Sequence, residues 1–242
     1  MPAGGAESER RAVVMGEKPV IRVKNLYKIY HVGETAVHAL DGLSFDIRRG
    51  EFCAIVGPSG SGKSTLLNML AGLEPPSRGE IVIAGTHIEH MTENELVAFR
   101  RERVGFIFQS YNLLPTMNAQ ENVAFPLSFR RMRPEERMRI AEEYLKLVGL
   151  GKVMDHMPGQ MSGGQQQRVG IARALAVKPE IIFADEPTGN LDSRTTMDVL
   201  KLMQNIVREQ RQTLVMVTHD NQIASYADRR FHIVDGKIHT ID

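Results

Sequence analysis

The stretch from Gly57 to Thr65 constrains this chain more than any other part of it. It reads Gly-Pro-Ser-Gly-Ser-Gly-Lys-Ser-Thr, which matches the phosphate-loop pattern G-x-x-x-x-G-K-[ST]. One apolar run, residues 52–56, precedes it, and a second, residues 66–70, follows it. These flanks predict a strand, a glycine-rich loop and the start of a helix, which is the context that the pattern requires. A glycine-rich turn that binds nothing is disfavoured, because the spacing, the Lys-Ser pair and both flanks agree.

Each residue type in this loop serves phosphate binding. Glycines let the backbone curl so that its N–H groups point at oxygen atoms, and the helix that follows adds its positive dipole end. Lys63 brings a full positive charge to the outer phosphates, and Ser64 offers a hydroxyl to a magnesium ion. We therefore expect nucleotide contacts from the whole loop: Gly57, Pro58, Ser59, Gly60, Ser61, Gly62, Lys63, Ser64 and Thr65.

Composition narrows the class of protein. The 242 residues carry 30 Lys and Arg against 29 Asp and Glu, a formal net charge of +1, which argues against a protein built mainly to coat nucleic acid. No apolar run approaches the roughly 20 residues that span a bilayer, and residues 1–10 lack the apolar core of a secretory signal. We expect the chain to stay in the cytoplasm, with residues 1–18 a disordered extension. Cys53, the one cysteine, lies in an apolar run, which predicts a buried and inert thiol.

Hydrophobic patterns predict an α/β fold with a mainly parallel sheet. Residues 21–26 alternate as a strand and residues 37–47 form a second strand region, which we expect to belong to an antiparallel β region near the N-terminus. Residues 181–185 and 213–218 are apolar runs, typical of parallel strands that are buried on both faces.

Residues from about 110 to 160 contain no run typical of a buried strand, which predicts a helical subdomain inserted in this core. Pro134 opens one of its helices. Five arginines cluster there: Arg130, Arg131, Arg133, Arg137 and Arg139. A solvated helix face, partly paired with neighbouring glutamates, is the favoured interpretation, and attraction to anionic lipid headgroups is the alternative.

Polar residues follow or end three of the predicted strands. Gln109 follows the strand at 104–108, Asp185 and Glu186 end the next one, and His219 follows the last. Open α/β sheets bind ligands at the carboxyl ends of their strands. Asp185 can hold magnesium, directly or through water, and Glu186 can orient and deprotonate water. A functional role for His219 is favoured over a structural one, whereas Gln109 alone decides little.

Two helix starts and one aromatic residue are further candidates. Ser162 is the predicted N-cap of a helix whose first residues, Gly163 and Gly164, expose N–H groups and could bind an anion, although a glycine-softened helix entry explains them equally well. Asp192 is the predicted cap of the next helix. Tyr30 could stack on a purine base, with a surface tyrosine as the alternative.

Together these motifs resemble the nucleotide-binding domain of ABC transporters. The resemblance covers residues from about 20 to 242, and we place the domain at 19–242. Gly57 to Ser64 is similar to the Walker A loop, and Ile181 to Asp185 to Walker B, followed by Glu186 in the place of the catalytic glutamate. Gln109 matches the Q-loop glutamine, and Met161 to Gln165 resembles the signature Leu-Ser-Gly-Gly-Gln. Gly189 to Asp192 matches the D-loop, and His219 matches the switch histidine. Tyr30 occupies the place of the aromatic residue that stacks on adenine. Met161 departs from the usual leucine, but the change conserves volume and apolar character.

The exact residues within and beside these motifs point to one branch of that family. Residues 109–115, 121–123, 162–169 and 187–192 resemble the lipoprotein-release, macrolide-export and cell-division group, whose ATPases transmit mechanical motion to membrane subunits. The same segments also resemble those of some peptide-export and amino-acid-uptake ATPases.

The resemblance implies an ATPase that uses ATP and Mg²⁺. Two such domains would form an ATP-dependent homodimer, head to tail, in which Ser162, Gly163, Gly164, Gln165 and Asp192 help bind the nucleotide. Ser64 and Gln109, with help from Asp185, would hold the metal, and the catalytic residues would be Lys63, Gln109, Glu186 and His219. The resemblance also implies an integral membrane transporter subunit that docks on the helical subdomain. The chain would then lie peripherally at the cytoplasmic face of the inner membrane, and no nucleic acid partner is expected.

Two other functions are weighed against this one. A soluble ABC ATPase that acts on DNA or ribosomes usually carries a long coiled coil or two ATPase domains, and this sequence has neither. A non-catalytic nucleotide-binding regulator is disfavoured because Glu186, Gln109 and His219 are all present.

Overall fold

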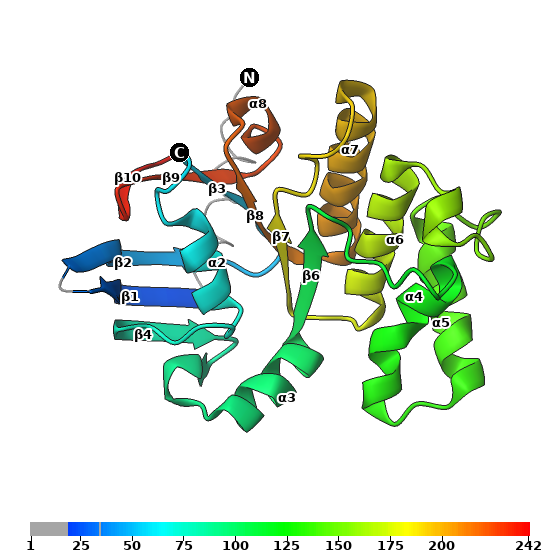
Figure 1. The fold of residues 1–242 in the computed structure, drawn as a ribbon, viewed down its shortest axis with the longest axis horizontal. Helices are drawn as coiled ribbons and strands as arrows, with labels where there is room; N and C mark the ends of the chain where they lie inside the picture. The colour runs from blue at the N-terminus through cyan, green and yellow to red at the C-terminus, as the bar shows by residue number, and fades with distance from the viewer. Residues whose placement is uncertain (1–18, 34) are drawn as a thin grey trace, which may run out of the picture.

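The computed structural model describes residues 19–33 and 35–242, so the predicted disordered extension, residues 1–18, lies outside the described residues. The described part is an α/β fold (Figure 1). Its strands are β1 (Ile21–Val32), β2 (Thr35–Ile47), β3 (Phe52–Val56), β4 (Arg78–Ile83), β5 (Thr86–His87), β6 (Val104–Phe108), β7 (Ile181–Asp185), β8 (Thr213–Thr218), β9 (Arg229–Val234) and β10 (Lys237–Ile241). Its α-helices are α2 (Lys63–Leu70), α3 (Glu93–Arg103), α4 (Ala119–Ala124), α5 (Pro134–Leu147), α6 (Gly163–Ala176), α7 (Ser193–Gln210) and α8 (Asn221–Ala224). Short 3-10 helices are η1 (Ile88–His90), η2 (Phe125–Arg130) and η3 (Pro158–Gln160).

The larger sheet has six strands in the order β10-β9-β3-β8-β7-β6. Strands β9, β3, β8, β7 and β6 run parallel, and β10 pairs antiparallel with β9. The mainly parallel sheet predicted from the sequence is therefore confirmed. β7 and β8 lie inside it, which is why their residues are mostly apolar.

The smaller sheet is antiparallel, in the order β2-β1-β4-β5, and confirms the predicted N-terminal β region. β1 is longer than the alternating residues 21–26 indicate. The register between β1 and β2 shifts after Val23, where Asn25 adopts a φ of +46°. This irregularity breaks the alternation of the side chains, so periodicity alone ends the strand too early.

Alternate residues of the parallel strands face two separate apolar cores. On one face, Cys53, Ile55 and Val215 pack with the apolar residues of α2 and of the antiparallel sheet. On the other face, Ala54 and Met216 pack with residues from α4 to α7. The sheet therefore joins two layers, one of them β-rich and the other helical. Cys53 is fully buried, and burial raises the pKa of its thiol, as expected for an inert core residue.

Helices make up the region between β6 and β7. The regular elements described between residues 110 and 160 are α4, η2, α5 and η3, which confirms the predicted helical character. α6 packs against α4 and α5, so these helices form one layer beyond the edge of the parallel sheet (Figure 1). Asn122 anchors this layer: its side chain is buried and hydrogen-bonds the main chain of Leu114, Met117 and Asn118.

Side-chain caps define the starts of α3, α6 and α7, and the caps at Ser162 and Asp192 are those predicted from the sequence. The box of Thr92 and Glu95 begins α3, that of Ser162 and Gln165 begins α6, and Asp192 accepts hydrogen bonds from the first residues of α7. The sequence predicts that α3 and α7 end at about Arg101 and about Arg208. In the structure α3 ends at Arg103 and α7 at Gln210, because helix ends carry weaker sequence signals than caps do. A search of the described residues for a helix both long and apolar enough to cross a bilayer finds none.

Candidate active site

The glycine-rich loop joins β3 to α2, and α2 begins at Lys63. Neighbouring strands approach this loop closely. A Cβ atom at Gly57 would lie 2.0 Å from the carbonyl oxygen of Ile233, and one at Gly62 would lie 2.4 Å from that of Ala39. Gly62 also has a φ of +98°, which side chains disfavour. The structure thus requires glycine at both positions.

A cleft of about 700 Å³ lies over this loop. Most of the predicted loop residues line it: Pro58, Ser59, Gly60, Gly62, Lys63, Ser64 and Thr65. Ala39, Glu186 and His219 complete the lining. Ala39 gave no signal in the sequence, because a small apolar residue in a strand carries no chemistry that marks it.

Ser61 differs from the rest of the loop. Its side chain is buried, and its Oγ atom has no hydrogen-bond partner within the described residues. Its main-chain oxygen accepts a hydrogen bond from the N–H of Gly236, in the turn between β9 and β10, at 3.1 Å. Ser61 and Gly57 are absent from the residues that line the cleft. Their predicted contacts with nucleotide stay predictions, and the structure gives both a role in packing.

Lys63, Asp185 and Glu186 form one electrostatic unit. The ammonium group of Lys63 donates a hydrogen bond to the carbonyl oxygen of Pro58 at 2.7 Å. Burial lowers the pKa of Lys63, although the charges of Glu186 and Asp185 oppose that change. Burial raises the pKa of Asp185, the negative charge of Glu186 adds to this, and Lys63 opposes it. A bound cation would therefore relieve the repulsion between the two carboxylates.

Glu186 is held in an unusual conformation. Its φ is +42°, in the left-handed region that residues other than glycine seldom adopt. Its N–H donates to the carbonyl oxygen of Val217 at 3.0 Å, so it remains joined to the sheet. Nδ1 of His219 lies 2.8 Å from its Oε1. The structure thus brings together two residues that the sequence placed at the ends of two different strands, which are neighbours in the sheet.

Gln109 lies beside the loop of residues 188–192 rather than in the cleft lining. A Cβ atom at Gly189 would lie 2.7 Å from Nε2 of Gln109, so the amide packs directly on this glycine. The main-chain oxygen of Gln109 accepts a hydrogen bond from Asn190 at 3.1 Å. Gln109 is therefore joined, through both its side chain and its main chain, to the loop that follows Glu186.

The second predicted anion site lies at the start of α6, away from the cleft lining. Ser162 and Gln165 cap the helix reciprocally. A Cβ atom at Gly164 would lie 2.3 Å from the side chain of Thr195, and one at Gly163 would lie 2.7 Å from the hydroxyl of Tyr111. Asp192 accepts hydrogen bonds from the N–H groups of Arg194 and Thr195.

Tyr30 lies outside the cleft lining but next to α2. Its hydroxyl donates a hydrogen bond to Glu74 at 2.8 Å, and the ammonium of Lys28 lies 5.2 Å from its ring centroid. Burial raises the pKa of Tyr30, and its hydrogen bond to Glu74 adds to this, whereas a contact with the Thr65 side chain opposes it. Because Thr65 lines the cleft, the Tyr30 ring is close to the predicted nucleotide site.

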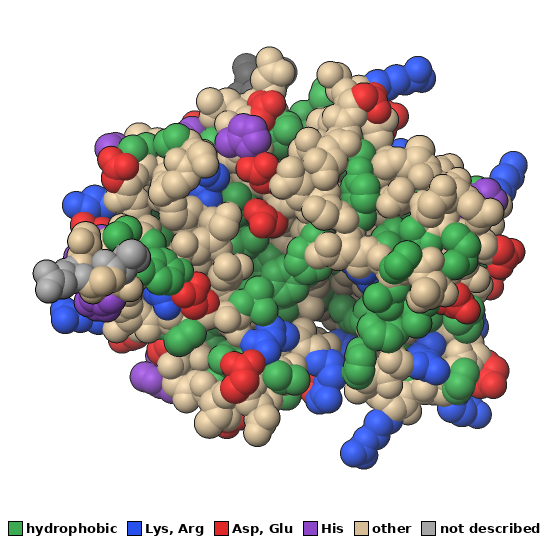
Figure 2. All heavy atoms as spheres, in the orientation of Figure 1, with side chains coloured by type: hydrophobic (Ala, Val, Ile, Leu, Met, Phe, Trp, Pro, Cys, Tyr) green, Lys and Arg blue, Asp and Glu red, His purple; other side chains and the backbone are tan. Residues whose placement is uncertain are grey.

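An apolar groove was missed by the sequence analysis. We call it the α3–η2 groove; it has a volume of about 530 Å³, and its lining includes Val97, Phe106, Phe108, Phe125, Phe129 and Arg173. Phe125 and Phe129 are 38% and 58% exposed, although their rings pack edge to face. Figure 2 shows hydrophobic side chains gathered over this part of the molecule, with Lys and Arg side chains beside them. Two phenylalanines four residues apart, directly before Arg130 and Arg131, were the available signal.

Comparisons with known proteins agree with this geometry. The profile of a family described as ABC transporter matches residues 40–189. An uncharacterized ABC transporter ATP-binding protein of Thermotoga maritima is 47% identical over 225 residues, which are 93% of this chain and 96% of that protein. The macrolide export ATP-binding/permease protein MacB of Marinobacter nauticus is 46% identical over 93% of this chain, which spans 35% of the length of MacB.

Solved structures are similar as well. The ATP-binding cassette MJ0796, in a dimeric post-hydrolysis state bound to ADP and Pi, has a TM-score of 0.84 and 42% identity to this chain. The match covers 92% of this chain and 97% of that one. MJ0796 is a protein of Methanocaldococcus jannaschii. A structure of cbiO1 from Clostridium perfringens, part of the transporter complex cbiONQ, has the same TM-score at 29% identity, covering 93% of this chain and 88% of that one.

Proposed function

This chain belongs to the ABC transporter family and is one of its ATP-hydrolysing cassettes; from that premise we propose that it couples nucleotide-driven closure of two cassettes to the motion of a membrane subunit. The observation that carries the proposal is the cleft itself. Its lining combines the phosphate loop with Glu186 and His219, so the residues that bind phosphate and those that act on water share one space.

The loop and α2 bind the triphosphate. The N–H groups of the loop and the start of α2 face the phosphate oxygens, and Lys63 exchanges its hydrogen bond with Pro58 for bonds to the outer phosphates. These groups stabilise the negative charge that the oxygens carry during phosphoryl transfer.

The residues present fit a magnesium ion. Ser64 supplies a hydroxyl in the cleft, and Asp185 supplies a carboxylate whose repulsion from Glu186 a cation would relieve. Gln109 completes the set if the loop at Gly189 lets its amide turn toward the cleft. When bound, Mg²⁺ neutralises phosphate oxygens and orients the transferred group.

Glu186 orients the attacking water and accepts its proton, and His219 contacts the γ-phosphate. The hydrogen bond between the two side chains fixes their relative positions at the mouth of the cleft. The left-handed backbone of Glu186 supports this role, because strain of this kind gathers at functional sites.

A second cassette completes the site. Ser162, Gly163, Gly164, Gln165 and Asp192 of one chain bind the nucleotide of its partner, since none of them lines the cleft of its own chain. Dimeric structures of the relative MJ0796 support dimerisation. The γ-phosphate then holds two positive helix starts together, so hydrolysis opens the dimer.

The membrane subunit docks on the helical layer, and we place its contact in the α3–η2 groove. The groove combines exposed aromatic side chains with arginine, which suits an amphipathic segment of a partner. MacB, in which a similar cassette is part of an ATP-binding/permease protein, supports a membrane partner. This chain then lies peripherally at the cytoplasmic face of the inner membrane.

An ATPase assay tests the catalytic part of the proposal. The wild-type protein should hydrolyse ATP in the presence of magnesium, and Lys63→Ala should lower turnover or ATP binding strongly because the charge that faces the outer phosphates is lost. Lys201→Ala, which removes an exposed lysine of α7, is the matched control and should behave as wild type. Turnover by Lys63→Ala equal to that of the control would refute the assigned loop.

Co-purification of this chain with the membrane complex from detergent-solubilised membranes tests whether the membrane subunit docks in the α3–η2 groove. Phe129→Ser should reduce the fraction of the protein that co-purifies with the membrane complex, while ATPase activity of the isolated protein stays unchanged. Leu73→Ser removes another exposed apolar side chain outside the α3–η2 groove and is the control. Equal co-purification of both variants would place the docking surface elsewhere.

A further inference from the structure

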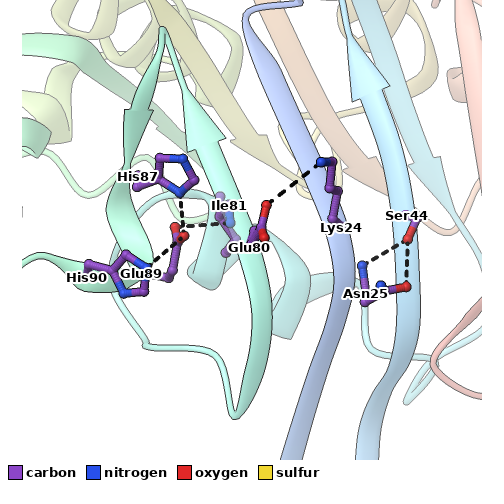
Figure 3. A network of polar contacts seen from close by, with 8 residues as sticks. All are labelled: Lys24, Asn25, Ser44, Glu80, Ile81, His87, Glu89 and His90. Atoms are coloured by element: carbon purple, nitrogen blue, oxygen red, sulfur yellow. Dashed lines mark hydrogen bonds and ion pairs between the residues drawn. The ribbon is translucent and has the colours of Figure 1, made fainter.

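Two histidines and one glutamate meet at the β5 edge of the antiparallel sheet, outside the lining of the nucleotide cleft. His87 ends β5, and Glu89 and His90 belong to η1 directly after it. Figure 3 shows the three side chains turned toward one another, with the Glu89 carboxylate between the two imidazoles. None of the three lines the nucleotide cleft.

The ligand atoms of this cluster, which we call the β5–η1 cluster, are close together. Nδ1 of His87 lies 2.6 Å from Oε1 of Glu89, and Nε2 of His90 lies 3.6 Å from the same oxygen. All three ligand atoms lie within 4.8 Å of one another. The two imidazole rings are nearly parallel, at 16°, with centroids 6.0 Å apart.

Glu89 is the fixed member of the β5–η1 cluster. Its side chain is only 4% exposed, whereas those of His87 and His90 are 51% and 79% exposed. Its second oxygen, Oε2, accepts a hydrogen bond from the N–H of Ile81 in β4 at 3.1 Å. One oxygen is thus tied to the sheet, and the other is aimed at the two imidazoles (Figure 3).

This buried carboxylate has no lysine or arginine as partner in the described part of the chain. The ion-pair contacts of Glu89 there are with the two imidazoles, and the neighbouring Lys24 pairs with Glu80 instead. A buried carboxylate needs compensating charge or hydrogen bonds. The N–H of Ile81 and the ring of His87 already hydrogen-bond this carboxylate, and a cation held between the three side chains would add the positive charge that no lysine or arginine supplies in the described residues.

We propose that the β5–η1 cluster is a site for Zn²⁺ or a similar divalent transition metal. Two imidazole nitrogens and one carboxylate oxygen are ligands that zinc accepts, with water in the fourth position. Magnesium prefers oxygen ligands alone, so the donor set distinguishes this site from the metal site of the nucleotide cleft.

The contacts of the two imidazoles with Glu89 are close to coordination geometry. In a tetrahedral zinc site, ligand atoms about 2.0–2.2 Å from the metal lie about 3.3 Å from each other. The contact of His90 with Glu89 is already near that value, and His87 must withdraw by under 1 Å. Both histidines are exposed and can turn. Metal binding selects the neutral tautomer of His87 that carries its one proton on Nε2, so that the lone pair of Nδ1 faces the metal.

Metal titration of the intact, tag-free and nucleotide-free protein tests the proposal. Zn²⁺ binding is measured by calorimetry, and Co²⁺ serves as a spectroscopic probe because its visible absorption reports tetrahedral coordination. The wild-type protein should bind one metal ion per chain. Zn²⁺ and Co²⁺ should compete for this site, and excess Mg²⁺ should displace neither. His87→Gln and His90→Gln should each weaken binding about tenfold or more, and the double variant should lose it.

His239→Gln is the matched control, because His239 is an exposed histidine of β10 outside the β5–η1 cluster. It should bind Zn²⁺ as the wild type does. Since His87 and His90 lie at the surface, their variants should fold normally, which far-UV circular dichroism checks. Zn²⁺ should also raise the thermal unfolding midpoint of the wild type and of His239→Gln but not of the double variant.

Two results would overturn the proposal. One is a wild-type protein that binds Zn²⁺ no more tightly than the double variant, with no Co²⁺ absorption of the tetrahedral type. The other is an equal loss of affinity in His239→Gln and in His87→Gln, which would mean that scattered surface histidines bind the metal. Neither result bears on ATP hydrolysis, so the proposed function is tested separately.

Discussion

Nδ1 of His219 lies 2.8 Å from Oε1 of Glu186, although the two residues are 33 positions apart in the chain. The register of the parallel sheet explains this contact. Asp185 of β7 is paired with Val217 of β8, so the residues that follow the two strands emerge side by side over the phosphate loop. The two side chains therefore lie together in the lining of the cleft.

Glu186→Gln should convert a transient dimer into a lasting one. The amide keeps the size of the side chain but cannot accept a proton from water, so ATP binds and is barely hydrolysed. It also removes the repulsion between the carboxylate and the γ-phosphate, which favours closure. Size-exclusion chromatography with light scattering should show a dimer with ATP and magnesium and a monomer with ADP.

The matched control for this experiment is Glu209→Gln, an exposed glutamate of α7, which should stay mostly monomeric like the wild type. A Glu186→Gln protein that remains monomeric at saturating ATP would count against the two-cassette mechanism. Equal dimerisation with ADP would show that the interface does not depend on the γ-phosphate.

His219→Ala should lower the turnover number by about 10²-fold while ATP binding persists, because the imidazole acts on the reacting group rather than on the bulk of the nucleotide. Steady-state hydrolysis and equilibrium ATP binding separate the two effects. His156→Ala, an exposed histidine of the helical layer, should leave both unchanged. Wild-type turnover in His219→Ala would remove the residue from the mechanism.

Tyr30→Ala should weaken ATP binding by about 1–3 kcal/mol if the ring stacks on adenine. Tyr30→Phe is the discriminating partner, because it keeps the ring and loses only the hydrogen bond to Glu74. Equilibrium binding of ATP should therefore be close to wild type for Tyr30→Phe and weak for Tyr30→Ala. Equal losses in both would mean that the hydrogen bond to Glu74 matters and stacking does not.

Asn122→Ala should destabilise the protein by about 3 kcal/mol, because it leaves the N–H and C=O of Leu114 without their side-chain partner inside the helical layer. Urea unfolding followed by circular dichroism measures the change. Asn94→Ala, an exposed asparagine of α3, should change the free energy of unfolding by under about 0.5 kcal/mol. Equal stability of the two variants would contradict the anchoring role of Asn122.

Local chemistry let the sequence predict much of the site. The phosphate loop, the caps at Ser162 and Asp192, and the apolar strands that end at Asp185 and Thr218 each carry their signal within a few consecutive residues. Such signals are short-range because they arise from backbone conformation, side-chain-to-backbone hydrogen bonds and burial on both faces of a strand.

The sequence by itself determined the α/β class and the parallel strands and predicted which residues react, because periodicity and residue chemistry suffice for these. Only the tertiary structure decided which residues meet. The contact of Glu186 with His219, the packing of Gln109 on Gly189 and the approach of Ala39 to Gly62 all depend on strand register and on how the layers stack. Those relations join residues far apart in the chain, and a pattern along one stretch of sequence carries no record of its distant neighbours.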